Sequence, residues 1–406
     1  MQLATPPWIT AGVALVGAGS IAAIPVARPL PDLLDLQSRA VRLTSGETDL
    51  LSAWVTQFND ASANATILAD DFGLAPGVGL QQAIVNQVGF LDQVINDPSS
   101  LSTVLTDFGN NLQNVLSSVF LVGASDATIK TVEAHTLDSL HGVAVSLLPS
   151  GLPTADQPAA EAIIQLLSSP ASAMFIGDVG PFISPWVAGL NSIEAIATDL
   201  QSGDTTAAMT ALVDAPANFV GAFFNGASLN LDALVPLLSQ LNLLPAGTEL
   251  TGLNYAFGGL FSPGSVTAGP YEFFNSSGTE IGHSIPAVGG SIFNSLGLNV
   301  DLGTTPIDIP GEPVGPIASL EGFSQAIGQL LGDGWDGKKP VPVPPLSTLT
   351  YPTLDASPAS DAASILTADT LPADALPADA VTSLSSILGD LSALPNDIGN
   401  ILTSLF

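Results

Sequence analysis

Residues 97–119 have the sequence DPSSLSTVLTDFGNNLQNVLSSV, and they decide the fold class that we expect. Asp97 and Pro98 supply a helix N-cap and a proline at the first helical position. Behind them, apolar residues recur at helical spacing: Leu101, Val104, Leu105, Phe108, Leu112, Val115, Leu116 and Val119. This stripe predicts an amphipathic helix with one buried face, and Gly123 is a residue at which it can end.

Similar stripes lie on both sides of this segment. Thr44 and Glu47 form a capping box ahead of a helix that contains Leu50, Leu51, Trp54, Val55 and Phe58. A second stripe consists of Leu80, Ile84, Val88, Leu91 and Ile95. Ser125 can cap a further helix that runs through Ile129, Val132 and Leu140. We expect the apolar faces of these helices to form the core of a bundle.

The helical pattern continues after Asp156, but glycine and proline become frequent. Residues 170–185 are predicted to be irregular, and helical spacing resumes from Trp186 to Leu200. Asp204 is a predicted cap for a helix from Thr205 to Phe224 that is interrupted at Pro216. Asp178, Asp214 and the prolines interrupt the most apolar stretches, so this part of the sequence predicts no clean membrane span.

Residues 250–309 differ from the rest, because short aromatic runs alternate with turn residues there. This is the region in which we expect strands. A short helix is predicted around Phe323 to Leu331, and a polyproline spacer from Lys338 to Pro345. The tail from Ser347 is rich in Ala, Asp, Pro, Ser and Thr. The predicted fold is therefore mainly α, with a Gly/Pro-rich helical body, a small strand-bearing insert and a disordered C-terminal tail.

The first 27 residues form a predicted segment of their own. No charged residue occurs from Leu3 to Ala27, and Ser20-Ile21-Ala22 has the small-x-small pattern of a signal-peptide cleavage site. The alternative is an uncleaved anchor, because about 20 apolar residues can span a bilayer. The predicted organisation is then 1–27 signal peptide or anchor, 28–249 helical body, 250–340 aromatic and Gly-rich region with short strands, and 341–406 low-complexity tail.

The charge of the chain excludes several function classes. The formal net charge is -31, with 37 acidic and 6 basic residues, and Lys130 is the only Lys or Arg between Leu43 and Gly337. Nucleic-acid binding and electrostatic docking on anionic lipid both need basic surfaces. The absence of cysteine excludes disulfides, thiolate zinc sites and cysteine nucleophiles. The apolar, cation-poor composition favours the cell envelope or the secreted pool.

Few residues suggest chemistry. Ser284 lies in Gly282-His-Ser-Ile-Pro286, which differs from a nucleophile elbow at its last position, so we expect a loop serine. His135 and His141 are six residues apart, on different helix faces, and His283 is the third histidine. Asp333 and Asp336 offer too few oxygens for a calcium loop. We therefore predict no catalytic, cofactor-binding or metal-binding residues, no cofactor, and a protein that is not an enzyme.

Four stretches resemble a known family: Thr10 to Ala22, Pro181 to Trp186, Leu212 to Gly226, and Phe257 to Gly264. They are similar to the mycobacterial gap-junction-like outer-membrane porin family, GjpA type, and the similar blocks extend over roughly residues 1–339. The resemblance implies a location in the outer membrane of the cell envelope and a channel role. It implies no particular catalytic or pore residue.

Two functions follow as expectations. In the first, the chain is an exported envelope protein that inserts or oligomerises, as a channel component that favours cations because acidic residues would dominate its polar lining. In the second, it is a non-enzymatic secreted or surface structural or interaction protein. Only residues 250–309 could supply strands, so one subunit cannot close a membrane barrel. Association with a membrane or the cell envelope, and with copies of itself in a homo-oligomer, is expected, and association with nucleic acid is not.

Overall fold

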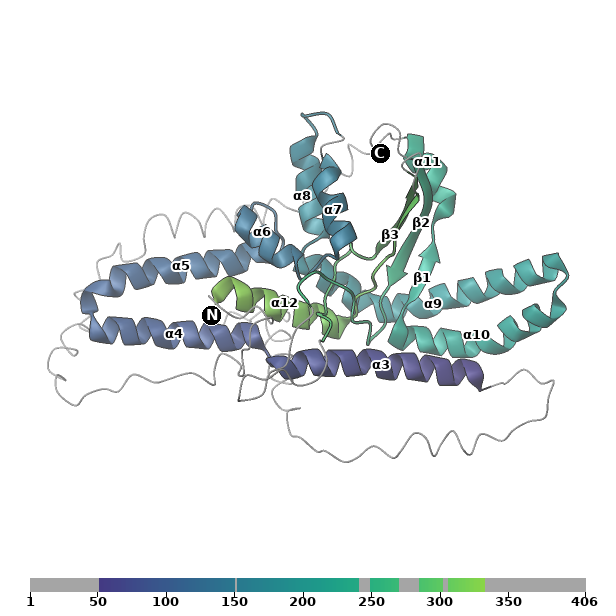
Figure 1. The fold of residues 1–406 in the computed structure, drawn as a ribbon, viewed down its shortest axis with the longest axis horizontal. Helices are drawn as coiled ribbons and strands as arrows, with labels where there is room; N and C mark the ends of the chain where they lie inside the picture. The colour runs from purple at the N-terminus through teal and green to yellow at the C-terminus, as the bar shows by residue number, and fades with distance from the viewer. Residues whose placement is uncertain (1–50, 150–151, 241–248, 270–284, 302–305, 333–406) are drawn as a thin grey trace, which may run out of the picture. The chain divides into compact units, whose positions relative to one another are not determined.

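The computed structural model describes residues 51–149, 152–240, 249–269, 285–301 and 306–332. In these ranges helices dominate and one small sheet accompanies them, so the predicted mainly α class is confirmed (Figure 1). Every described residue belongs to one compact unit, which begins at Leu50. The predicted signal segment, the capping box at Thr44 and the predicted tail lie outside the described residues, and the predicted domain boundaries stay predictions.

The first described helices are α3 (Ser52–Leu74), α4 (Val78–Asn96) and α5 (Leu101–Ser118). Asp97 acts as the predicted cap, since its side chain accepts a hydrogen bond from the Ser99 N–H at 3.0 Å. The turn that it caps is the 3₁₀ helix η1 (Pro98–Ser100), and α5 begins directly behind it. Figure 1 shows α4 and α5 running side by side.

Three shorter helices follow: α6 (Asp126–Glu133), α7 (Ser139–Leu147) and α8 (Gln157–Leu167). Ser125 caps α6 by accepting from the Thr128 N–H at 3.2 Å, as predicted. The predicted continuation through Leu140 is wrong, because α6 ends at Glu133. Asp138 caps a new helix there, accepting from the His141 N–H at 2.7 Å, and a local side-chain bond of this kind favours a fresh helix start.

The long apolar helices α9 (Pro170–Ser202) and α10 (Thr205–Asn225) form an antiparallel hairpin turned at Gly203 (Figure 1). The predicted irregularity over residues 170–185 and the predicted break at Pro216 are both wrong, because the helices continue through their prolines. An interior proline costs about 3 kcal/mol, so tertiary contacts must offset it. The predicted cap is confirmed, since Asp204 accepts from the Ala207 N–H at 2.9 Å.

The sheet has four antiparallel strands in the order β1-β2-β3-β4. Its strands are β1 (Ala227–Asn230), β2 (Glu249–Phe257), β3 (Leu296–Asp301) and β4 (Pro306–Ile309). The predicted strand region contains β3 and β4 and all but the first residue of β2, whereas β1 was not predicted and pairs Ala227 with Phe257. The 3₁₀ helix η3 (Asp232–Leu234) and helix α11 (Val235–Gln240) follow β1 in the chain.

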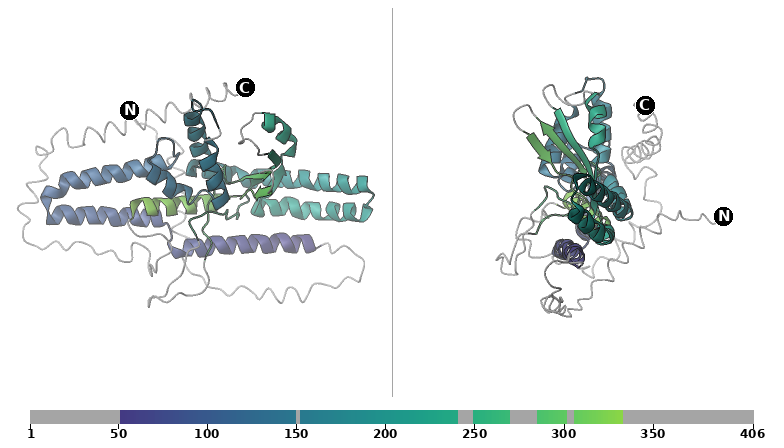
Figure 2. Two further views of the ribbon diagram at one scale, coloured as in Figure 1. Left: turned by 45° about the horizontal axis from the view of Figure 1, so that its top comes forward. Right: turned by 90° about the vertical axis from the view of Figure 1, so that its right-hand side faces the viewer.

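The last described helix, α12 (Pro316–Leu331), holds the structure together. It includes the helix predicted around Phe323 and packs against α4, α5, α6 and α9, as Figures 1 and 2 show from several sides. One core cluster joins α3, α9 and α12 with two connecting segments: Leu68, Ile176, Val288, Val314 and Ala318. A second joins α6 to α12 through Val132 and Ala326.

Several predicted core stripes are exposed, which corrects the expectation of a conventional bundle core. These side chains are Trp54 and Phe58 of α3, Leu80, Ile84, Leu91 and Ile95 of α4, and Leu101 and Phe108 of α5. Val104 is the one apolar side chain of the α5 stripe that is buried. The spacing of the apolar residues correctly predicts that α3, α4 and α5 are helices with an apolar face. In the described part of the chain, much of that face does not pack against another helix or strand.

Backbone segments that are far apart in the sequence meet at glycines on α9. A Cβ atom added at Gly180 would lie 2.5 Å from the carbonyl oxygen of Gly258, just beyond β2, and one at Gly177 would lie 2.9 Å from that of Gly315. Ser184, one turn further along α9, donates to the carbonyl oxygens of Phe257 at 3.1 Å and Gly258 at 3.0 Å. This packing fixes the end of β2 on α9 and helps to explain why the helix continues through Pro181 and Pro185.

Candidate functional site

The α9–α10 hairpin carries an uncovered apolar surface, which we call the outer face. It consists of the exposed apolar residues Phe175, Phe182, Trp186, Leu190, Ile193 and Leu200 of α9 and Met209, Leu212, Phe219 and Val220 of α10. Phe182 and Trp186 are each 70% exposed. Within each helix these residues recur at spacings of three, four or seven residues, apart from the adjacent pair Phe219 and Val220, which places them on one side. Large exposed apolar patches of this kind mark protein or membrane interaction sites.

Aromatic contacts join the two helices into one surface. The ring centroids of Trp186 and Phe219 are 5.6 Å apart, and those of Phe182 and Phe223 are 6.1 Å apart, both in T-shaped geometry. Rings in this arrangement attract one another beyond the effect of area burial. The outer face therefore extends across α9 and α10 instead of being split between them.

Both helices are long and apolar enough to cross a membrane, each with a mean hydropathy of 1.3 in its most apolar window. Of that window 44% is buried within the structure in α9, but only 22% in α10. The helices continue through the prolines and acids that interrupt the sequence pattern. The expectation that no later segment is a clean membrane span stays a prediction, because length and composition alone pass many helices that do not cross a membrane. Among the described residues Lys130 of α6 is the only Lys or Arg, so the outer face carries no cation.

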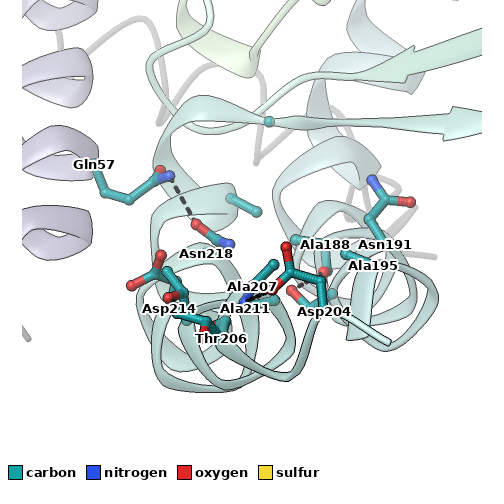
Figure 3. A pocket seen from close by; sticks show the side chains of 14 residues that line it. Gln57, Ala188, Asn191, Ala195, Asp204, Thr206, Ala207, Ala211, Asp214 and Asn218 are labelled. Carbon is teal, nitrogen blue, oxygen red and sulfur yellow. Dashed lines mark hydrogen bonds between the residues drawn. The ribbon is translucent and has the colours of Figure 1, made fainter. Parts of the chain in front are cut away.

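The opposite side of the hairpin forms a cleft of about 760 Å³, which polar side chains line together with alanines. Figure 3 shows Asp204 and Asp214 on its α10 side and Asn191 on its α9 side. Asn218 accepts a hydrogen bond from the Gln57 amide of α3 at 3.3 Å, which closes one end (Figure 3). Small alanine side chains line much of the remainder, so carboxylate and amide groups meet an open aqueous space.

The hairpin thus separates two kinds of surface around α10. Met209, Leu212 and Phe219 lie on the outer face, whereas Asp214 and Asn218 line the cleft. Asp214 follows Met209 by five residues, which at 3.6 residues a turn places them far apart around the helix. An apolar side and an acidic, hydrated side on one hairpin suit a position at a boundary between lipid and water.

A pair of buried carboxyl groups links α3 to α12. Asp71 is only 1% exposed, and its Oδ2 accepts from the Gln325 amide at 2.8 Å. Burial raises the pKa of Asp71 to about 7, against the smaller opposing effects of Gln325 and the Val288 backbone. Burial, and then the neighbouring Asp71 carboxylate, raise the pKa of Glu321 to about 9. One oxygen of each carboxyl has no hydrogen-bond partner. At neutral pH these pKa values leave Glu321 mostly protonated and Asp71 about half protonated.

The histidines considered in the sequence lie in the packed core. His135 is 1% exposed and His141 is 0% exposed. His141 Nε2 is 2.7 Å from the Leu296 carbonyl oxygen, which ties α7 to β3. Its Nδ1 is 3.0 Å from Asp138 Oδ1, an ion-pair distance without the alignment of a hydrogen bond. Burial lowers the pKa of His141, but Asp138 and the Leu296 carbonyl outweigh burial and the net pKa is raised.

No group of three or more His, Cys, Asp or Glu side chains in the described ranges could hold a metal ion. His283, Ser284, Asp333 and Asp336 lie outside the described residues. The outer face was missed in the sequence, although the spacing of Trp186, Leu190 and Ile193 was recognised as helical. Extending that spacing back to Phe182 would have lengthened the apolar stripe, but it would not have shown that the stripe is exposed. The Asp71–Glu321 pair could not be recognised in the sequence, because the two residues are far apart along the chain and only the tertiary fold brings them together.

Compared with protein-family models, with curated proteins and with solved structures, the chain matches none of them.

Proposed function

We propose that this chain is a non-enzymatic cell-envelope protein that enters lipid through the outer face of its α9–α10 hairpin. The observation that carries the proposal is the uncovered apolar surface around Phe182 and Trp186, which are each 70% exposed. Leaving such side chains in water is unfavourable by roughly 1.5–3 kcal/mol each relative to burial. The resemblance of residues 181–186 and 212–226 to an outer-membrane family adds to the proposal, since these stretches lie in the hairpin.

The chemistry of the outer face sets the kind of membrane contact. Interfacial helices commonly use Lys and Arg to hold anionic lipid, but the outer face has neither. Attraction must therefore come from apolar burial alone. The net charge of -31 opposes approach to an anionic surface. The proposed contact is with neutral or zwitterionic lipid.

If several copies of the protein assemble in a membrane, the hairpin has one side suited to lipid and another suited to water. Its outer face would meet lipid, and the cleft side with Asp204 and Asp214 would line a shared aqueous path. Carboxylate rings favour cations over anions. A cation-favouring channel component is therefore the finer proposal, and it depends on oligomerisation, whereas membrane entry does not.

Lipid partitioning tests membrane entry. Replacing Phe182 and Trp186 together by serine is expected to lower partitioning onto phosphatidylcholine vesicles at least about 100-fold, because two exposed aromatic side chains contribute roughly 1.5–3 kcal/mol each and 1.4 kcal/mol is a factor of ten. Vesicle flotation measures the bound fraction. Binding of the unaltered chain should weaken when phosphatidylserine is added.

Val143→Ser on α7 is the matched control, because Val143 is also exposed, at 56%, but lies away from the hairpin. It should leave flotation unchanged. Equal losses in both variants, or no loss in either, would remove the outer face as the lipid contact.

The channel proposal has its own test. Purified protein in a planar bilayer is expected to give conductance steps with a cation-selective reversal potential, and selectivity should weaken towards 1 M salt, where screening shortens to about 3 Å. Asp214→Asn should lower the cation-to-anion permeability ratio, whereas Asp107→Asn, on the exposed side of α5, should not. A silent bilayer with folded, membrane-bound protein would leave membrane entry standing and reject the channel.

A surface interaction protein without a pore is the second candidate. The exposed stripes of α4 and α5 favour it, since Leu91 and Phe108 are 54% and 43% exposed and lie away from the hairpin. Alkaline carbonate extraction of envelope membranes separates the candidates, because a protein held only by protein contacts is released and one inserted in lipid stays with the membrane.

A further inference from the structure

An apolar groove of about 370 Å³ runs between α3 and α10. Its walls are aromatic: Trp54 and Phe58 of α3 face Phe224 of α10 and Phe261 of the segment after β2. The Phe224 and Phe261 rings stack with centroids 5.7 Å apart, and the Phe261 N–H donates to the Phe224 carbonyl at 2.9 Å. This wall is therefore fixed by both ring stacking and backbone bonding.

Small residues keep the groove open. Ala61 and Ala65 of α3 and Gly221 of α10 also line it. A side chain at Gly221 would collide with the Gln57 side chain, so α3 and α10 approach closely there. Gln57 is held in place, because its amide donates to Asn218 and its Oε1 accepts from Asn225 at 3.0 Å. The groove is a depression between packed helices rather than a gap that closer packing could remove.

The lining selects an apolar ligand without charge. Among the described residues that line the groove none is acidic or basic, and Gln57 and Ser62 are the ones with an amide or a hydroxyl group. A charged group placed there would lose its hydration without gaining a partner. The size lies within the range of about 300–1,000 Å³ that small-molecule sites occupy, and apolar and aromatic walls are typical of such sites. A single alkyl chain fits this description better than a planar polar molecule or an anion.

The groove is continuous with the outer face. The Phe224 ring contacts Phe223 at 5.1 Å, and Phe223 contacts Phe182 of the outer face at 6.1 Å. Val220 belongs to both surfaces, because it is 45% exposed and lines the groove. Trp54 and Phe58, at 42% and 59% exposure, leave the groove open along its length. An alkyl chain that lies on the outer face can thus enter the groove without crossing a polar surface.

We infer that this groove binds one acyl chain of an uncharged or zwitterionic membrane lipid, with the headgroup left in water. The inference that the groove binds an alkyl chain depends on the geometry of the groove alone. The inference that the alkyl chain comes from a membrane lipid rests on the proposed membrane association. The bound acyl chain would leave the bilayer where the α9–α10 hairpin contacts the membrane. Because the groove lies between α3 and α10, the acyl chain would contact both helices.

Tryptophan quenching tests the inference. Trp8, Trp186 and Trp335 are replaced by phenylalanine, which leaves Trp54 in the groove wall as the only tryptophan of the full chain. 12-Bromododecanol, whose bromine quenches tryptophan on contact, is expected to quench Trp54 fluorescence saturably, and unbrominated dodecanol should reverse the effect. Quenching that rises linearly with the alcohol concentration and does not saturate would indicate random collisions, and it would contradict a binding site in the groove.

Two alanines on the same helix provide a matched pair. Ala61→Phe fills the groove and is expected to weaken apparent affinity at least about tenfold, since one displaced apolar group of this size is worth more than 1.4 kcal/mol. Ala63→Phe adds the same ring at an exposed position two residues away and should change nothing. If Ala61→Phe does not retain the helical circular dichroism spectrum, Ala61→Leu, which adds fewer atoms, should give a severalfold loss. Equal quenching in the Ala61 and Ala63 variants would overturn the inference.

A second arm uses vesicles of brominated phosphatidylcholine. Quenching in both arms supports the site and its lipid source. Quenching by the free alcohol alone keeps the groove as an alkyl-chain site but rejects the membrane as the source. Failure in solution rejects the groove whatever the vesicles show. An apparent affinity for the alcohol that rises when the protein is diluted would assign the groove to a second copy of the protein, because self-association would then compete with the alcohol.

Discussion

Replacing Gly258 by alanine is expected to remove at least about 3 kcal/mol of folding stability, at the upper end of the 1–3 kcal/mol that overpacking usually costs. The added methyl would meet the carbonyl group of Val314 from one side, while the Gly258 carbonyl lies against Gly180 of α9 from the other. Neither neighbour is a flexible side chain, so whole backbone segments would have to move. Urea denaturation followed by far-UV circular dichroism measures the loss.

Gly89→Ala is the control for the loss of a glycine. Gly89 lies inside α4, is exposed and has nothing within 4 Å of an added Cβ. Alanine there should stabilise by up to about 1 kcal/mol, because it favours the helix without a steric cost. A Gly258→Ala variant as stable as the unaltered chain would show that the backbone segments at Gly258 and Val314 do not approach as closely as described.

Folding stability is expected to fall as pH rises from about 5 to 9, the reverse of the usual behaviour of carboxyl groups. Asp71 and Glu321 have pKa values raised from 3.8 and 4.5 to about 7 and about 9, with burial as the main cause. The folded state therefore holds protons that the unfolded chain releases. The protonated carboxyl groups contribute their full stabilisation of the fold below about pH 4, near the unfolded pKa values. This stabilisation is lost as the pH rises through the folded pKa values of about 7 and about 9. Each extra proton gives a slope of roughly 1.4 kcal/mol per pH unit.

The double variant Asp71→Asn/Glu321→Gln should flatten this pH profile and be more stable than the unaltered chain at pH 9, because neither replacement ionises. Urea midpoints at pH 5, 7 and 9 give the comparison. Glu161→Gln, at an exposed position of α8, controls for the loss of one negative charge. A variant that keeps the full slope would place the titrating groups elsewhere, and His141 and Glu312, whose pKa values are also raised, would be the next to replace.

Local chemistry explains what could be predicted from the sequence. Asp97, Ser125 and Asp204 each cap the turn beside them through a side-chain bond to a backbone N–H two or three residues later. Such bonds depend on neighbouring residues only, so the sequence contains all the information that they need. The helices over residues 101–118 and 205–225 were accordingly expected near their observed starts.

Contacts between distant residues explain what could not be predicted. Pro181 and Pro185 would break a helix on local grounds, but Ser184 and Gly180 bind α9 to the backbone around Gly258, more than 70 residues along the chain. The same holds for β1, four residues long, which forms a strand because Phe257 and Ala256 offer it an edge. Periodicity also cannot distinguish a buried stripe from an uncovered one, so Trp186 and Phe182 were predicted as helix or loop and not as a surface.

Lys130, exposed on α6, has a practical consequence for detecting this protein. Trypsin cuts after Lys and Arg, so between Arg42 and Lys338 it has one site, and it leaves the two peptides Leu43 to Lys130 and Thr131 to Lys338. Cleavage at that site requires α6 to open locally, and its rate would report on that opening. Peptides of such length are identified poorly in shotgun mass spectrometry, so tryptic surveys would undercount the protein. A protease that cuts at acidic residues would give far better coverage, because 37 of them are spread along the chain.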